Sequence, residues 1–107
     1  MKVKNRVKRY DEFQKVINFG EQVRSKYLVM YFLKNELNYA RVGISIPKKT
    51  GIAVLRNKIK RQIRAVLTIE LNLDLSYDLI FISRREYDVT NFAQVKHDIQ
   101  ELLAKVG

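Results

Sequence analysis

The longest regular pattern in this sequence runs from residue 51 to about residue 70, shortly after the only proline, Pro47. Apolar residues recur there three or four positions apart, which is the spacing of one face of an α-helix. At about 100° per residue these side chains fall within an arc of about 80°. We expect this stripe to face the core, and its members are Ile52, Leu55, Ile59, Ile63 and Val66.

A second face of the same helix is basic and carries no acid. Seven cations occur between residues 47 and 64 without a single Asp or Glu. An ordinary solvated helix face, which is the alternative interpretation, usually mixes both signs, with Glu one turn before Lys. The absence of acid favours a partner with regularly spaced negative charges, such as nucleic-acid phosphates. We call the helical part the basic row; it comprises Arg56, Asn57, Lys58, Lys60, Arg61 and Arg64, and Lys48 and Lys49 precede it.

The N-terminus is a second acid-free basic segment. Residues 1–9 hold five cations, and the two segments together hold more than half of the 21 lysines and arginines. The rest of the chain carries slightly more acids than cations, so the charge is localised, which indicates a polyanionic partner. Two interpretations of this segment stay open, a flexible arm that touches RNA phosphates or a solubilising tail. Its cations are Lys2, Lys4, Arg6, Lys8 and Arg9.

The remaining patterns predict an α+β fold. Helical spacing predicts helices over residues 11–19 and from Asn91 onward, while residues 27–33, 39–46 and 79–82 read as strands. We expect the strands at 27–33 and 39–46 to pair antiparallel. The chain should form a single-domain α/β sandwich over residues 1–107, with an about four-stranded mixed sheet in the order α-β-β-β-α-β-α.

Several classes of site and location are disfavoured by the composition. There is no cysteine, which excludes disulfides and thiol chemistry and agrees with a cytoplasmic location. The longest apolar run has seven residues, far below the roughly 20 that a membrane helix needs, so no membrane is expected as a partner. His97 is the only histidine, and Asp74 and Asp78 look like a loop beside buried residues. We therefore expect no catalytic residue and no metal bound by protein side chains.

The basic helix also carries a resemblance to a known family. Residues 48–64 read KKTGIAVLRNKIKRQIR, which resembles the signature of the bacterial ribonuclease P protein, Arg-Asn-Arg followed by Ile-Lys-Arg-x-Ile-Arg. Residues 41–45, 4–8 and 11–16 are similar to the family as well. Lys58 replaces the second arginine of the signature, which keeps the charge but loses the planar two-pronged donor.

The resemblance implies a fold and two binding sites. The fold would be like that of the second domain of ribosomal protein S5, with a left-handed strand-helix-strand connection where the general rule favours a right-handed one. The basic row would bind the catalytic RNA of ribonuclease P. The 5′ leader of precursor tRNA would lie in a cleft lined by Phe13, Ile17 and Tyr31, whose spacing alone favours plain core packing. Ile17 stands where the family usually has an aromatic residue, so it can pack on a base but cannot stack.

The resemblance also implies which steps belong to the RNA subunit and which to the protein. The RNA subunit would require Mg²⁺ and carry out the endonucleolytic removal of the leader, while the protein would bind RNA and supply no nucleophile or base. Two other functions compete with this interpretation. A general RNA-binding module would use the same basic helix without an aromatic cleft. A protein that binds acidic membranes or heparin-like polymers would need an exposed apolar face beside the cations.

Overall fold

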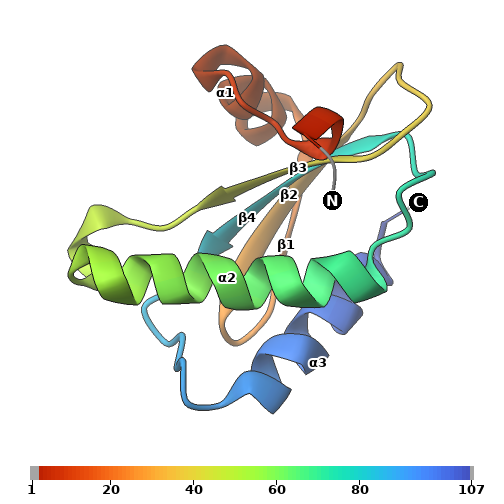
Figure 1. Cartoon of the computed structure of the whole chain (residues 1–107). Helices are drawn as coiled ribbons and strands as arrows, with labels where there is room; N and C mark the ends of the chain where they lie inside the picture. The colour runs from red at the N-terminus through yellow and green to blue at the C-terminus, as the bar shows by residue number, and fades with distance from the viewer. Residues whose placement is uncertain (1–2, 107) are drawn as a thin grey trace.

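The computed structural model describes residues 3–106 and has the α+β class and element order predicted from the sequence (Figure 1). Two short 3-10 helices, η1 and η2, supplement the three helices and four strands. In chain order the elements are η1 (Val3–Asn5), α1 (Tyr10–Phe19), β1 (Glu21–Arg24), β2 (Leu28–Lys34), β3 (Arg41–Ser45), η2 (Lys48–Thr50), α2 (Ala53–Glu70), β4 (Tyr77–Ser83) and α3 (Phe92–Leu103).

The four strands form one mixed sheet in the order β1-β2-β4-β3. β2 runs antiparallel to both β1 and β4, whereas β3 runs parallel to β4. The prediction that the strands at 27–33 and 39–46 pair with each other is therefore wrong, because β4 lies between them. Leu79, Ile80 and Phe81 of β4 are fully buried, and a strand that is apolar on both faces belongs in the middle of a sheet.

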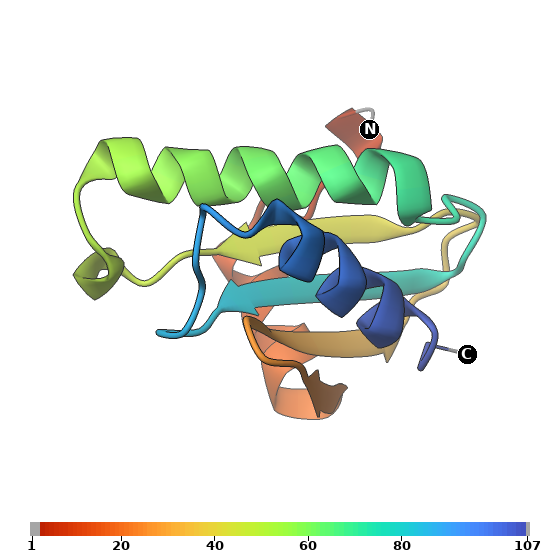
Figure 2. The same ribbon diagram turned by 90° about the horizontal axis from the view of Figure 1, so that it is seen from below.

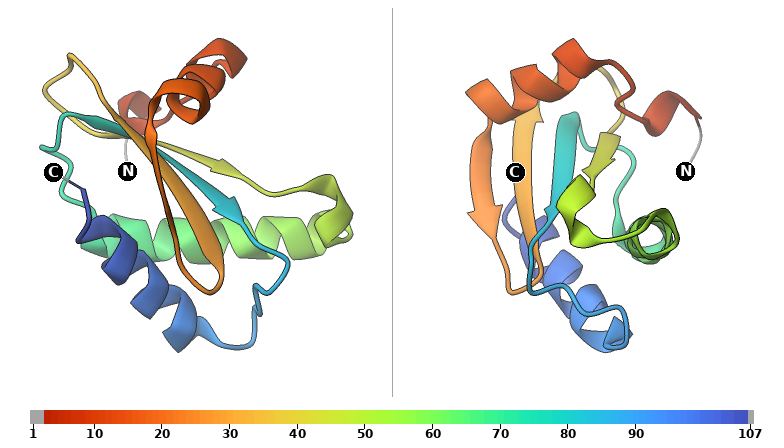
Figure 3. Two further views of the ribbon diagram at one scale, coloured as in Figure 1. Left: turned by 180° about the vertical axis from the view of Figure 1, so that it is seen from behind. Right: turned by 90° about the vertical axis from the view of Figure 1, so that its left-hand side faces the viewer.

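Helices cover both faces of the sheet. α2 and α3 lie together on one face, and α1 crosses the other (Figures 1 and 3). The main core fills the space between the sheet and α2 and α3, where Leu28, Met30 and Phe81 meet Ile63 and Ile99. A smaller cluster of Val7, Val16 and Ile80 lies under α1. The face of the sheet under α1 therefore buries fewer apolar side chains than the face under α2.

The connection from β3 through α2 to β4 is left-handed. Figure 2 shows α2 in front of the sheet, with β3 and β4 pointing the same way side by side. When the strands are turned to point upward in that view, β4 lies to the left of β3. About 98% of such connections are right-handed, so this crossover is an exception to the rule, as the family resemblance implies.

α2 begins two residues later than its sequence pattern suggests. Ile52 is the N-cap residue with an extended backbone (φ −68°, ψ 164°), so its side chain does not follow the helical period. It is 74% exposed, and the prediction that Ile52 faces the core is wrong. Further along the helix, Leu55 is half-buried, and Ile59, Ile63 and Val66 are buried as expected. Within residues 3–106 no helix is long and apolar enough to cross a membrane.

Candidate nucleic-acid interface

The basic row lies on the face of α2 that points away from the sheet. Burial of Ile59 and Ile63 against the core fixes the rotation of the helix and leaves the cations outward. Asn57, Lys58, Arg61 and Arg64 are exposed, while Arg56 and Lys60 are half-buried. A shallow hollow of about 420 Å³ follows the row and is lined by Val54, Asn57, Lys60, Arg61 and Arg64.

The charge of this face is not neutralised within the described part of the chain. The ion pairs found among residues 3–106 involve other cations, none of them from residues 48–64. The Arg56 Nε donates a hydrogen bond to the Gly51 carbonyl oxygen over 3.1 Å, which ties one guanidinium to the start of the helix without reducing its charge. The row can therefore receive anionic oxygens along its whole length.

The N-terminal segment is anchored to the outer edge of β3. The Val7 amide donates to the Val42 carbonyl oxygen over 2.9 Å, and the Asn5 side chain donates to the Ala40 carbonyl oxygen over 2.8 Å. Asn5 and Val7 are buried, whereas the residues on either side of each are exposed. The outward side chains are Lys4, Arg6, Lys8 and Arg9, whereas Lys2 lies outside the described residues.

The two basic segments meet on one side of the molecule. Figure 3 (right) shows the N-terminal segment, η2 and α2 all at the β3 edge, away from β1. Lys48 and Lys49 in η2 are exposed there. Segments separated by some forty residues in the sequence thus form one positively charged side, which no local pattern could have predicted.

The side chains of the expected leader cleft come from α1 and from β2, which α1 contacts. Phe13, Ile17 and Tyr31 are all half-buried, and Phe13 and Tyr31 pack on the Val16 and Ile80 cluster. The Phe13 ring lies on the backbone of Gly43, where a Cβ atom would come within 2.5 Å of its Cζ. The Tyr31 hydroxyl accepts a hydrogen bond from the Gln22 side chain over 2.8 Å. Each ring therefore packs against the protein and remains partly accessible to solvent.

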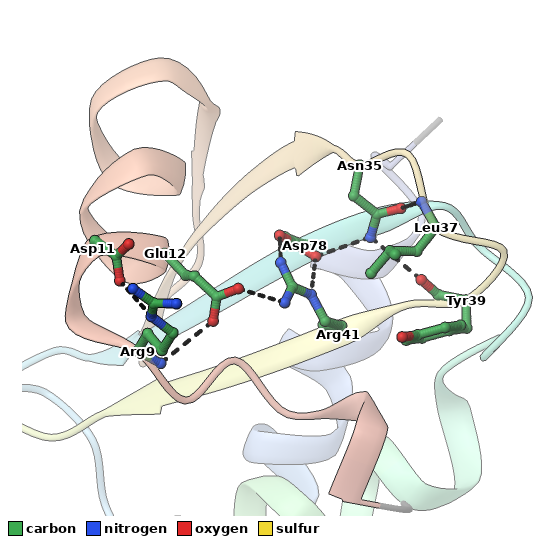
Figure 4. A network of polar contacts seen from close by, with 8 residues as sticks. All are labelled: Arg9, Asp11, Glu12, Asn35, Leu37, Tyr39, Arg41 and Asp78. Atoms are coloured by element: carbon green, nitrogen blue, oxygen red, sulfur yellow. Dashed lines mark hydrogen bonds and ion pairs between the residues drawn. The ribbon is translucent and has the colours of Figure 1, made fainter.

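A polar network fixes α1 to the sheet (Figure 4). Arg41 donates twice to Asp78, from Nε over 2.9 Å and from Nη2 over 2.6 Å, and its Nη1 donates to Glu12 over 2.7 Å. The hydrogen bond from Arg41 is the main reason that the pKa of Glu12 lies below its usual value. The same partners, Asp78 first, raise the pKa of Arg41.

This network was not predicted from the sequence. Asp78 was expected in a loop, whereas the residue is buried near the start of β4 and pairs with Arg41 on β3. A signal was present, because Asp78 directly precedes the most apolar run of the chain. A buried carboxylate there needs a cation or hydrogen-bond donors, but nothing in the sequence says which residue supplies them.

The described residues offer no metal-binding group. Between residues 3 and 106 no three His, Asp or Glu side chains gather in a way that could hold a metal ion. His97 is 67% exposed, with its Nδ1 3.8 Å from a carboxylate oxygen of Asp98. That carboxylate is engaged elsewhere, since it accepts hydrogen bonds from the Tyr27 amide over 2.8 Å and the Gln94 side chain over 2.6 Å.

Comparisons with known proteins agree over the whole chain. The sequence model of the family described as Ribonuclease P matches residues 1–107. The Ribonuclease P protein component of Mesoplasma florum is 38% identical over 107 residues, covering 98% of this chain and 97% of the relative. The solved RNase P protein of Staphylococcus aureus superposes with a TM-score of 0.83 at 35% identity, covering 95% of this chain and 96% of that one. That of Thermotoga maritima gives a TM-score of 0.84 at 26% identity, covering 95% and 97%. The chain therefore belongs to the bacterial ribonuclease P protein family, whose members are the protein subunit of the endoribonuclease that matures the 5′ ends of tRNAs.

Proposed function

We propose that the basic row binds the catalytic RNA of ribonuclease P and that the open side of α1 holds the 5′ leader of precursor tRNA. The observation that carries the proposal is the exposed, acid-free row on α2, whose cations make no ion pair with any residue from 3 to 106. Membership of the family supplies the identity of the RNA partner.

The basic side suits an RNA backbone. Successive cations one helical turn apart can each contact a phosphate, and each contact releases bound counterions. Lys58 makes a point-charge contact there, without the two-pronged geometry of arginine. The same surface is extended around the β3 edge by Lys48 and Lys49 and by the described N-terminal cations Lys4, Arg6, Lys8 and Arg9. Neutralising phosphates in this way stabilises the folded RNA.

The open side of α1 suits a single strand of varied sequence. Any unpaired base offers a flat face, and stacking on an aromatic side chain contributes roughly 1–3 kcal/mol per base. Phe13 and Tyr31 are half-buried, so each ring is fixed and still presents part of its surface. Ile17 adds an apolar contact without stacking. This protein thereby increases the affinity for substrates that carry a leader.

The protein contributes binding and positioning to the reaction. The RNA subunit binds the Mg²⁺ that it requires and activates the water that cleaves the leader from the tRNA. The side chains of this chain hold the two RNAs in place and reduce the repulsion between their phosphates. We place this assembly in the cytoplasm, where precursor tRNA is made in bacteria.

The test is cleavage of 5′-labelled precursor tRNA by a bacterial ribonuclease P RNA at low Mg²⁺, with and without the protein. We expect the protein to restore accurate cleavage and the double variant Arg61→Ala, Arg64→Ala to lose much of that effect. The matched control is Lys96→Ala, Lys105→Ala, which removes two exposed cations from the α3 end of the molecule. No restoration with any such RNA, despite tight and salt-sensitive RNA binding, would leave a general RNA-binding module instead.

A further inference from the structure

The first residue of α1 is an aromatic side chain with almost no packing. Tyr10 is 78% exposed, although Phe13, one turn later on the same helix, is half-buried. A lone exposed aromatic residue is ordinary on a protein surface, so exposure alone indicates nothing. Its place on the helix decides what it can contact.

Tyr10 lies on the same flank of α1 as the leader-binding side chains. At about 100° per residue, Tyr10, Phe13 and Ile17 fall within an arc of about 60°. The opposite flank carries Glu12, which turns toward Arg41 and Asp78 (Figure 4). Phe19 lies about half a turn from Tyr10 and is similarly exposed, at 75%. The two exposed rings of α1 therefore face different surroundings.

The direction of α1 places Tyr10 at the charged side of the molecule. Phe13 packs on Gly43 of β3, and the helix then crosses the sheet toward β1, which follows it in the chain (Figure 3). Tyr10 is thus at the β3 end, next to the exposed Lys8 and to Arg9, whose Nε pairs with Asp11 Oδ1 over 3.2 Å at the surface. A strand that leaves an RNA held at this edge passes Tyr10 before it reaches Phe13.

We propose that Tyr10 is a third stacking residue, which extends the leader-binding surface by about one helical turn toward the β3 edge. The inference rests on the proposed function of the α1 side, and it names the residue that links the leader surface to the basic side. A tyrosine suits the position because its ring gives a base a flat apolar face while its hydroxyl stays in water.

The test compares variants in the reconstituted holoenzyme, by measuring Kd for precursor tRNA with a leader and for mature tRNA without one. Tyr10→Ala is expected to weaken binding of the leader-bearing substrate by about 5- to 150-fold and to leave mature tRNA unchanged. Tyr10→Phe keeps the ring and should bind like the wild type. Phe19→Ala removes an equally exposed ring from the other flank and should change neither Kd. Both positions are at the surface, and circular dichroism checks that each of the three variants is folded.

Further variants separate failure of the inference from failure of the proposed function. If Phe13→Ala and Tyr31→Ala weaken leader binding but Tyr10→Ala behaves like Phe19→Ala, Tyr10 takes no part and the leader surface ends at Phe13. If none of these variants distinguishes the two substrates, the leader surface itself is wrong. Equal loss of both substrates with Tyr10→Ala would also overturn the inference, because the ring would then act on the tRNA body or the catalytic RNA.

Discussion

At the scale of single residues, the buried carboxylate of Asp98 joins two distant parts of the chain. It accepts hydrogen bonds from the Tyr27 amide just before β2 and from Gln94 one turn earlier on α3. Asp98→Ala would leave that buried amide without a partner, which costs about 1–3 kcal/mol. We expect a correspondingly lower free energy of unfolding in urea titrations.

His97→Ala is the matched control for this prediction. The imidazole is the neighbouring side chain on the same helix and is 67% exposed, so its removal should change the free energy of unfolding by about 0.5 kcal/mol at most. Equal effects of the two substitutions would mean that the carboxylate contributes nothing beyond its helical position.

Gly43 is the second residue whose role follows from one contact. A Cβ atom there would meet the Phe13 ring at 2.5 Å and the Ile80 Cδ1 at 2.8 Å, so Gly43→Ala must displace both side chains. Overpacking of this kind costs about 1–3 kcal/mol. We expect lower stability and, in the holoenzyme, weaker binding of precursor tRNA relative to mature tRNA, because Phe13 moves. Retention of the full preference for the leader would show that the position of Phe13 does not matter for binding it.

At the scale of elements, the Arg41 network determines how α1 sits on the sheet. Glu12 has its pKa lowered mainly by the hydrogen bond from Arg41, so it favours folding in its ionised form. A carboxylate with a depressed folded-state pKa stabilises the protein above its unfolded pKa, near 4.5, and this contribution is lost as the pH falls through the folded value. Glu12→Gln should therefore flatten the loss of stability that sets in as the pH falls below about 4.5.

Urea midpoints across that pH range measure the effect. The control is Glu36→Gln, which removes an exposed carboxylate from the turn after β2 that makes no bond to Arg41. Parallel pH profiles for wild type and Glu12→Gln would contradict the prediction. A second consequence is that Glu12→Gln loosens the orientation of α1, so its leader preference should fall while its affinity for the catalytic RNA stays.

Elements with a strong local period were predictable, and their pairings were not. The apolar stripe predicted the start of α2 to within two residues. Of the residues in the stripe, only Ile52, which precedes the first turn, was wrongly predicted to be buried. β1 has just one half-buried residue, Val23, so it lacks the alternation by which strands are recognised. The pairing of β3 could not be predicted, because its partner β4 begins more than thirty residues downstream. No turn motif marks a connection of that length.

At the scale of the whole molecule, the sheet separates the two surfaces that we propose bind RNA. α2 and the N-terminal segment lie at the β3 edge, and α1 lies on the opposite face of the sheet from α2 (Figures 1 and 3). The first two segments carry exposed cations, whereas α1 carries the half-buried Phe13 and the exposed Tyr10. The basic row was predictable because it is local to one helix. Two features could be seen only in the fold, because both join segments that are far apart in the sequence. They are the position of the row beside the N-terminal cations and the pairing of Arg41 with Asp78.

This separation predicts that the salt dependence of RNA binding comes from the basic side. The observed association constant, Kobs, falls with salt, and each phosphate contact steepens the slope of log Kobs against log salt concentration by about 0.7 for single strands to 0.9 for duplexes. Assembly of the protein with the catalytic RNA should therefore weaken steeply with salt, and Arg61→Ala, Arg64→Ala should reduce the slope by about 1.4 to 1.8. The Lys96→Ala, Lys105→Ala variant loses the same net charge from α3 and the residues after it, and it should keep the wild-type slope. If both double variants reduce the slope equally, the RNA responds to the total charge of the protein, and the row on α2 has no special place in the interface. Tyr10→Ala and Phe13→Ala should leave this slope unchanged, because stacking releases no counterions.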